Sequence, residues 1–380
     1  MNNSITLDKI VFKPRDINLS KSPLRNGIDR ETYVLGAFNP GMTRLPNGNM
    51  LLMVRVAEAL KDISLKEKSF SVIRKPVGSG FMIEEYDSAN FCTDDPRKYL
   101  SKEYTHTKIY ALTSYSWLLP VEFSEDATEL IKIHYDKILQ PETTYQEYGM
   151  EDARITKIND KFYLTVCCVG SERHSTALYV SDNGLDYNNL GIIQDHQNKD
   201  MVLFPKKIGD FYYALTRPLG DHFFISSAEA SLLPGPSINI ARSPDLLHWK
   251  PLESPLITMR KNSRISKRLG AGSQPLLTEK GWLILFHGVD DLGGVGQYNT
   301  YWALLDKDDP SLILKMDIKN PVLQANYDLT DGLDDNRYVE NIVFTTGINE
   351  LEDKYIIASG ELDLYCRITH ISKSWFSKLF

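Results

Sequence analysis

Hydrophobic and polar residues alternate along this chain in short runs that are typical of β-strands rather than helices. Apolar residues seldom recur at helical spacing, whereas runs of aromatic and β-branched residues bounded by Gly, Asn and Asp occur throughout. One unit recurs, in which a short polar turn leads into such a run. Its five copies occupy Leu45–Glu58, Lys157–Gly170, Lys206–Pro218, Leu277–Val289 and Glu350–Asp363.

This repeat predicts a radial array of sheets. The middle three copies are each followed by a second strand-like run, at Thr176–Ser181, Ile238–Ser243 and Tyr301–Asp306. A strand, a turn and a partner strand, repeated along a chain, are typical of a propeller. The five copies therefore predict an all-β fold, a single five-bladed β-propeller domain over residues 1–380 with a short C-terminal tail. A β-sandwich with additional domains is the alternative, because any β-protein alternates turns and apolar strands.

One segment interrupts the pattern, from Ala59 to about Thr105. It is polar and mixed in charge, with few strand signals after Val72 and Ile73. Loops of this length within compact domains are often functional or mobile. We expect a long loop insertion around residues 59–105 that covers one face of the fold.

Composition and charge narrow the class of protein. With 380 residues, 42% of them hydrophobic and 24% charged, the chain is typical of a soluble globular protein. The net charge of −7 disfavours nucleic acid as a partner and is compatible with a neutral sugar. Cys92, Cys167, Cys168 and Cys366 have no metal or redox spacing, which predicts free thiols in a reducing compartment. Without a leader-like or membrane-spanning stretch, we expect a cytoplasmic protein that has no membrane partner.

Candidate chemistry lies where polar residues meet the strands. Glu151, Asp152 and Arg154 stand within four consecutive residues just before the second repeat. Inner strands of a propeller point toward a common axis, so polar residues at strand ends converge there. A carboxylic acid beside several cations suits a reaction with an anionic nucleophile, because the cations hold phosphate while the acid protonates the leaving oxygen. The residues expected to gather with Glu151, Asp152 and Arg154 are Arg55, Arg173, Lys207, Arg217 and His287.

Structural roles compete with each of these assignments. Asp152 could cap a turn, His287 could be a satisfied core histidine, and Arg55 and Arg217 could close structural salt bridges. The basic run Arg260–Arg268 is either a solvated loop or a cationic rim beside an anion site. An inverting hydrolase would need a second carboxylate as base, so the ratio of cations to carboxylates around the axis separates the two chemistries.

Several motifs, in a fixed order, carry a resemblance to a known family. They are Phe38–Gly41, Leu52–Glu58, Gly149–Ile155, Leu203–Ile208, Arg217-Pro218, Ser243–Trp249, Gly270–Gly272, Gly281–Val289 and Ala303–Pro310. From about residue 34 to about residue 363 the chain resembles the mannoside phosphorylases and mannosidases of glycoside hydrolase family 130. It departs from the family pattern at Ala153, where proline is usual, at Thr216, where many of the phosphorylases have histidine, and at Arg55–Glu58, which is one residue longer.

The resemblance implies a five-bladed propeller and an inverting β-mannoside phosphorylase. It implies that Asp152 is the general acid, acting through a hydroxyl of the mannosyl unit, and that phosphate attack gives α-mannose 1-phosphate. Inorganic phosphate is then the co-substrate, a small mannoside is the partner, and no other cofactor is expected. The phosphate-binding candidates are Arg55, Arg173, Lys207 and Arg217, and the substrate-binding candidates are Asn39, Glu151, Arg154, His287 and Asp290.

Two other functions stay open at this point. An inverting β-mannoside hydrolase of the β-1,2-mannosidase type would need a base, for which Glu58, Glu151, Asp290 and Glu340 are candidates. A non-catalytic carbohydrate-binding propeller is the second, since fold alone does not give function. The oligomeric state also stays open, with a homo-oligomer as one expectation.

Overall fold

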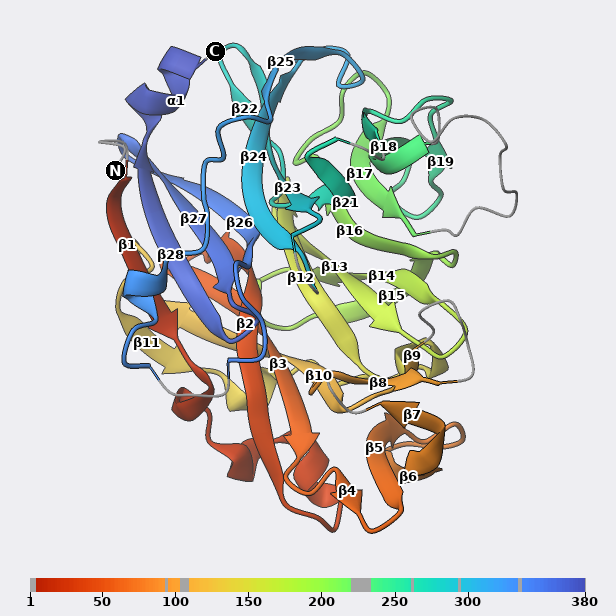
Figure 1. Ribbon diagram of the computed structural model, residues 1–380. Coiled ribbons are helices and arrows are strands. Elements are labelled where there is room, and N and C mark those ends of the chain that lie inside the picture. Colours follow the sequence, from red (N-terminus) through yellow and green to blue (C-terminus); the bar gives the residue numbers. More distant parts are fainter. Residues whose placement is uncertain are drawn as a thin grey trace.

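Each of the five repeated runs forms the second strand of its own antiparallel sheet. In the computed structural model these are strands β3, β13, β17, β23 and β27. The structure describes residues 5–92, 95–102, 109–219, 234–260, 263–292, 295–333 and 337–379. Within these ranges the fold is all-β, as predicted, with five sheets of four or five strands in chain order (Figure 1).

The five sheets share one plan, an inner strand followed outward by its antiparallel neighbours. The first contains β2 (Thr32–Arg44), β3 (Met50–Leu60), β10 (Ser114–Phe123) and β11 (Leu130–Ile133). The second contains β12 (Met150–Ile158), β13 (Lys161–Val169), β14 (His174–Ser181) and β15 (Asn188–Gln194). The third contains β16 (Asn198–Leu203), β17 (Tyr212–Pro218), β18 (Pro234–Ser243), β19 (Lys250–Pro251) and β20 (Ile257–Arg260). The fourth contains β21 (Ile265–Ala271), β22 (Leu276–Thr278), β23 (Gly281–Asp290), β24 (Gln297–Leu305) and β25 (Ile313–Asp317). The fifth contains β26 (Val343–Leu351), β27 (Lys354–Glu361), β28 (Tyr365–Ser372) and β1 (Ile5–Phe12).

Each of the five sheets contacts the next one along the chain, and the fifth contacts the first. Inner strand β2 contacts β12, β12 contacts β16, β16 contacts β21, and β26 contacts both the fourth sheet and β2. Strand β1, red in Figure 1, pairs with β28, blue, so both ends of the chain belong to one sheet. The inner strand β12 is almost wholly buried, whereas the outer strands β11 and β19 are largely exposed. The inner strands therefore lie at the centre of the molecule.

The turns before four of the repeated strands each contain a residue in the left-handed backbone region. Gly48, Asn159, Gly209 and Glu352 all adopt positive φ, at 91°, 54°, 58° and 49°. Glycine reaches this region without steric cost, and asparagine reaches it more easily than most residues do. These turns lead the chain from an inner strand into the second strand of the same sheet.

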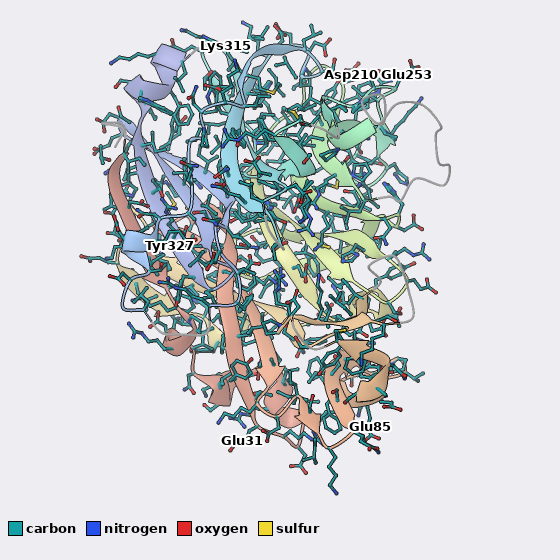
Figure 2. All side chains as sticks on the ribbon, viewed as in Figure 1. Glu31, Glu85, Asp210, Glu253, Lys315 and Tyr327 are labelled. Carbon is teal, nitrogen blue, oxygen red and sulfur yellow. The ribbon has the colours of Figure 1, made fainter. Side chains whose placement is uncertain are left out.

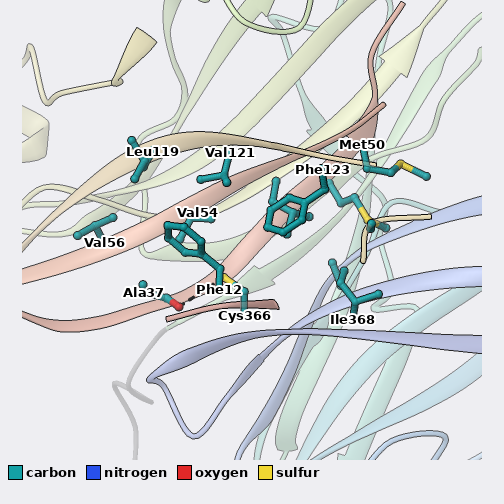
Figure 3. Close-up of a cluster of buried hydrophobic side chains, with 14 of the residues drawn as sticks. Phe12, Ala37, Met50, Val54, Val56, Leu119, Val121, Phe123, Cys366 and Ile368 are labelled. Carbon is teal, nitrogen blue, oxygen red and sulfur yellow. Dashed lines mark hydrogen bonds between the residues drawn. The ribbon is translucent and has the colours of Figure 1, made fainter. Parts of the chain in front are cut away.

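One large core cluster fills the space between the fifth sheet and the first (Figure 3). Phe12 and Ile368 from one side meet Val54, Val121 and Phe123 from the other, and all are fully buried. Complete burial of a Val, Phe or Ile side chain stabilises a fold by about 1.5–3 kcal/mol each. This packing joins the sheet that holds both chain ends to its neighbour.

The segment predicted as a loop insertion contains strands, in two small sheets between β3 and β10. They are β4 (Ser64–Leu65), β5 (Lys68–Arg74), β6 (Phe81–Asp87), β7 (Phe91–Cys92), β8 (Lys98–Ser101) and β9 (Ile109–Leu112). Phe70, Val72 and Phe81 pack with Tyr115 in a core of their own, which gives these strands a hydrophobic face to bury. Strands β5, β6 and β7 of this segment lie at the lower right of Figure 1.

Helical elements are short. The 3-10 helices are η1 (Pro14–Asp16), η2 (Leu19–Lys21), η3 (Pro23–Asn26), η4 (Ser88–Asn90), η5 (Tyr135–Lys137), η6 (Thr144–Gln146) and η8 (Tyr327–Leu329). The C-terminal tail forms helix α1 (Lys373–Leu379), which buries Phe376 against Tyr355. In the described part of the chain, no helix has the length and apolar character needed to cross a membrane.

Charged side chains populate the outer surface, where Glu31, Glu85, Asp210, Glu253 and Lys315 are exposed (Figure 2). All four cysteines are free thiols, as predicted, and three of them are buried. Buried charge is therefore the feature that needs explanation, and much of it lies around the inner strands.

Candidate active site

Three inner strands carry the same local distortion. Pairing with the second strand breaks register at Asn39 in β2, at Asp152 in β12 and at Asp200 in β16. Their φ values are 47°, 53° and 54°, in the left-handed region that Asn and Asp tolerate better than most residues. Such breaks in a β-ladder re-aim side chains and are common near active sites. All three side chains are buried.

Asp152 lies at the centre of a network of charges. Its Oδ1 accepts hydrogen bonds from Asn39 Nδ2 at 2.8 Å and from Arg55 Nη1 at 3.0 Å. Arg55 also donates through Nη2 to Glu151 Oε1 at 2.7 Å and through Nε to Ser116 Oγ at 3.1 Å. One guanidinium thus bridges both carboxylates, a contact that suits the several donors of its planar fork.

Lys199 is the second cation of this network. Its Nζ donates to Glu151 Oε2 at 2.7 Å, opposite the oxygen that Arg55 holds. Burial opposes ionisation of Asp152 and Glu151, but Arg55 and Lys199 outweigh it and keep the pKa of each carboxyl below its ordinary value. The same carboxylates raise the pKa of Arg55 and Lys199 in spite of burial. All four groups are therefore charged at neutral pH.

Asp200 organises a neighbouring cluster in the same way. Its Oδ2 accepts from Arg217 Nη1 at 2.6 Å, and its Oδ1 lies 3.5 Å from Arg154 Nη2. Arg154 is 1% exposed and also donates to the backbone carbonyls of Asp152 at 2.7 Å and Gly272 at 2.5 Å. Arg154 thereby ties the bulge of the second sheet to the fourth sheet, and Asp200 holds Arg217 in place.

His287 completes this cluster as a neutral ring. It is fully buried, packs on Phe344 and Tyr298 with centroids 4.7 and 5.8 Å apart, and its Nε2 lies 3.4 Å from Arg217 Nη1. Burial lowers the pKa of His287 to about 3, because the nearby Asp200 offsets burial only in part and Arg217 adds to the shift. Its Nδ1 has no hydrogen-bond partner among the described residues.

A cavity of 360 Å³, to which all five sheets contribute, is lined by Arg55, Glu151, Asp152, Lys199 and Arg217. Arg154, Asp200 and His287 are not among its described lining residues. Phe38, Tyr298, Tyr338 and Phe344 give it aromatic walls. Its described cationic lining residues are Arg55, Arg97, Lys98, Lys199, Arg217 and Arg268, and its carboxylates are Glu151, Asp152 and Asp363. The excess of cations suits an anionic ligand, and the aromatic walls suit a ligand with an apolar face.

The insertion supplies one wall of the cavity. Arg97 makes a paired contact with Asp95 and reaches across to Asp363 Oδ2 at 3.3 Å. Asp363 lies in the β27–β28 turn, and Tyr338 Oη donates to its backbone carbonyl at 2.8 Å. Burial raises the pKa of Asp363, with Arg97 and Arg55 opposing. Of the residues expected to gather with Asp152, Arg55 and Arg217 therefore line the cavity, and His287 contacts Arg217.

Two predicted phosphate ligands lie outside this cavity. Arg173 is 38% exposed and pairs with Glu172 at 2.9 Å and Asp195 at 3.7 Å. Lys207 is exposed in the turn before β17, with its Nζ 5.0 Å from the centre of the Tyr212 ring. The expectation that both would gather with Asp152 is wrong, because each sits in a loop away from the bulged inner strands. We assign them no role in the site.

Three of the four carboxylates considered as the base of a hydrolase lie outside the described lining of the cavity. Glu58 is buried among Ser22, Thr32 and Trp117, whose side chains all donate to it. Asp290 accepts from Arg264 Nε at 2.9 Å, and Glu340 is exposed. None of these three is among the described residues that line the cavity. No group of three or more His, Cys, Asp or Glu side chains in the described ranges could hold a metal ion.

Residues 109–375 match the model of a family described as beta-1,4-mannooligosaccharide phosphorylase, glycoside hydrolase family 130. The chain belongs to glycoside hydrolase family 130. A family 130 member from Listeria innocua, named beta-1,2-mannobiose phosphorylase, is 32% identical over 91% of this chain and 90% of its own. A 1,2-beta-oligomannan phosphorylase from a Thermoanaerobacter strain is 30% identical over 63% of this chain and 73% of its own. The solved complex of the Listeria enzyme with beta-1,2-mannobiose superposes with a TM-score of 0.81, at 29% identity over 97% of this chain and 96% of that one.

Sequence reasoning missed several residues in or beside this cavity, among them Lys199, Asp200 and Arg97. Lys199 and Asp200 are adjacent, as Glu151 and Asp152 are, and both pairs stand at the register break of an inner strand. A search for paired polar residues ahead of each repeat would have found them. Arg97 gives no such signal, because its contact with Asp363 joins residues that are far apart in the sequence.

Proposed function

We propose that this family 130 chain is an inverting β-mannoside phosphorylase that cleaves short β-1,2-linked mannosides with inorganic phosphate. The names of its relatives give the substrate class and linkage. We further propose that the five sheets are the blades of a five-bladed propeller. The circular order of contacts between them and the pairing of β1 with β28 support this arrangement.

The observation that carries the proposal is the charge balance of the cavity. Six described lining side chains are cationic and three are carboxylates. An excess of cations suits a phosphate dianion, whereas an inverting hydrolase needs a free carboxylate to activate water. Each of the three carboxylates has an arginine partner, Arg55 for Glu151 and Asp152 and Arg97 for Asp363.

In the proposed reaction a phosphate oxygen attacks the anomeric carbon of the mannosyl unit from the side opposite the leaving group. The new carbon–oxygen bond forms as the glycosidic bond breaks, which inverts the β-linkage to α-mannose 1-phosphate. The proton of Asp152 passes through a mannosyl hydroxyl to the leaving oxygen and releases the shortened acceptor. General acids of this kind contribute about 10²–10⁴-fold to the rate.

Asp152 needs a proton for this role, although Arg55 and Lys199 outweigh burial and lower its pKa. A phosphate dianion beside these two cations would offset their charge. Burial, which raises the pKa, would then prevail, and Asp152 could take up a proton. Asp152 thus becomes protonated when phosphate binds, so that proton transfer to the leaving group depends on the presence of the nucleophile.

The test is turnover of β-1,2-mannobiose with and without inorganic phosphate. The proposal expects α-mannose 1-phosphate and mannose only when phosphate is present. Release of free mannose alone, at the same rate in both conditions, would show a hydrolase instead.

A further inference from the structure

The imidazole of His174 lines the cavity but has no role in the reaction described above. His174 is the first residue of β14, and it shares the cavity lining with Glu151, Lys199 and Arg217. Its neighbour Arg173, which the sequence predicts as a phosphate ligand, lies outside the described lining. The structure therefore has a histidine, and not the adjacent arginine, beside the cations of the site.

The hydrogen bonds of His174 determine which ring nitrogen carries the proton. Its backbone N–H donates to Gln197 Oε1 at 2.9 Å, and its Nδ1 lies 3.2 Å from the same atom. An atom that accepts from a backbone N–H is the amide oxygen, because the amide nitrogen can only donate. Nδ1 is therefore the protonated nitrogen, and Nε2 keeps its lone pair.

The ring is neutral at pH 7 and accessible from the cavity. Burial and the nearby Lys199 lower the pKa of His174 to about 4. Arg217 adds to this shift, and Glu151 opposes it. Nε2 has no hydrogen-bond partner among the described residues and, unlike Nδ1 of His287, is not buried out of reach of a ligand. His174 thus presents a hydrogen-bond acceptor to the cavity.

An acceptor among cations distinguishes between oxyanions. Lys199 and Arg217 can only donate hydrogen bonds, so they suit the unprotonated oxygens of any oxyanion. Nε2 of His174 can only accept, so it needs an oxygen that bears a proton. Hydrogen phosphate has one P–OH group at neutral pH, whereas sulfate has none. Sulfate would leave Nε2 facing an oxygen with which it forms no hydrogen bond.

We propose that His174 makes the phosphate site selective for oxyanions that carry a proton, by accepting the P–OH hydrogen of hydrogen phosphate at Nε2. The proton stays on the oxygen that faces His174 and remains there in mannose 1-phosphate. An unprotonated oxygen is left to attack the anomeric carbon. His174 thereby determines specificity and positions the nucleophile without exchanging a proton. This role rests on the proposed function, which places phosphate beside Lys199 and Arg217.

Discrimination between phosphate and sulfate tests this role in the native protein. Isothermal titration should show that phosphate binds at least about tenfold more tightly than sulfate, the loss expected when one hydrogen bond to a charged ligand cannot form. Arsenate, which also carries a proton at neutral pH, should bind as phosphate does. Equal affinity for phosphate and sulfate would overturn the proposal.

A variant without the acceptor should lose this discrimination. His174→Phe keeps a ring at this position and removes Nε2. It should weaken phosphate binding about tenfold and leave sulfate binding unchanged or stronger. Arg173→Ala, which alters the neighbouring residue outside the cavity lining, is the matched control and should keep the preference for phosphate. An equal loss of preference in both variants, or no loss in His174→Phe, would contradict the assignment.

Kinetics with β-1,2-mannobiose separate this inference from the proposed function. KM for phosphate should rise about tenfold in His174→Phe, while KM for the mannoside stays unchanged. A rise in KM for the mannoside alone would mean that Nε2 accepts from a sugar hydroxyl instead. Phosphate-dependent turnover without a preference over sulfate would refute the role of His174 and leave the phosphorylase standing. A preference for phosphate without phosphate-dependent turnover would do the reverse.

Discussion

Removing Arg55 should destabilise the protein strongly at neutral pH and much less in mild acid. Arg55, Glu151 and Asp152 have side chains that are 14%, 9% and 8% exposed, so the contacts between them are barely screened by solvent. In Arg55→Ala the two carboxylates keep Lys199 and Asn39 as partners but lose the cation that bridges them. Breaking a buried pair from one side costs about 3–5 kcal/mol.

The expected change in Tm follows from the size of the chain. For 380 residues the entropy of unfolding is about 0.8 kcal/mol/K. A loss of 3–5 kcal/mol then lowers Tm by about 4–6 °C at pH 7. Lys61→Ala is the matched control, because it breaks a 2.8 Å ion pair with Glu31 whose side chains are 55% and 74% exposed. That variant should leave Tm nearly unchanged.

The pH dependence carries the sharper test. In the native protein the pKa of Asp152 and Glu151 is lowered, so their stabilising contribution is present above the unfolded pKa values, about 3.9 and 4.3, and is lost as pH falls below them. Without Arg55 burial raises both pKa values, so protonation relieves the unpaired charge as pH falls. The Tm difference between native protein and Arg55→Ala, measured by calorimetry, should shrink from pH 7 to pH 4.5. A difference that stays constant, or one no larger than that of Lys61→Ala, would refute this reasoning.

Three further variants test the site. Asp152→Asn should lower kcat about 10²–10⁴-fold while circular dichroism stays native, since the change removes a proton donor and keeps the shape; near-normal turnover would mean that another group is the acid. Lys199→Ala should raise KM for phosphate about 10–100-fold through loss of a charged hydrogen bond, whereas Lys207→Ala, outside the cavity, should not; equal effects would contradict the assignment. Asp200→Asn should raise KM for phosphate more than KM for the mannoside, because Asp200 positions Arg217 at 2.6 Å; a fall in kcat alone would argue against positioning.

Much of the fold could be predicted because the sequence repeat reflects two physical requirements, the burial of a strand and the turn that leads into it. Four of the second strands, β3, β13, β23 and β27, are almost wholly buried, and tight turns precede them, and both features leave a strong local signal. The strands of the insertion leave a weaker one. They are short, and only one face of β5 and β6 packs into the small core of Phe70, Val72 and Phe81.

The site could be predicted only where strand ends determine it. Arg55, Arg217 and His287 are the polar residues within the repeated strands, although β3 continues past Arg55 to Leu60 and β23 past His287 to Asp290, and Asp152 lies on the strand that pairs with β13. Lys199 and Asp200 depend on a register break in β16, and a shift of one residue changes which face a side chain occupies. Periodicity read from the sequence does not locate such breaks, so it predicts Lys207 at the site, whereas the structure has Lys199 there.

The fate of the glycosidic bond tests the central claim most directly. The enzyme would be incubated with β-1,2-mannobiose in phosphate-free buffer and in buffer with inorganic phosphate, and the products followed by ³¹P and ¹H NMR. The account predicts α-mannose 1-phosphate and one mannose per bond cleaved, with turnover that requires phosphate. Two molecules of free mannose per bond, at a rate that phosphate does not change, would contradict it.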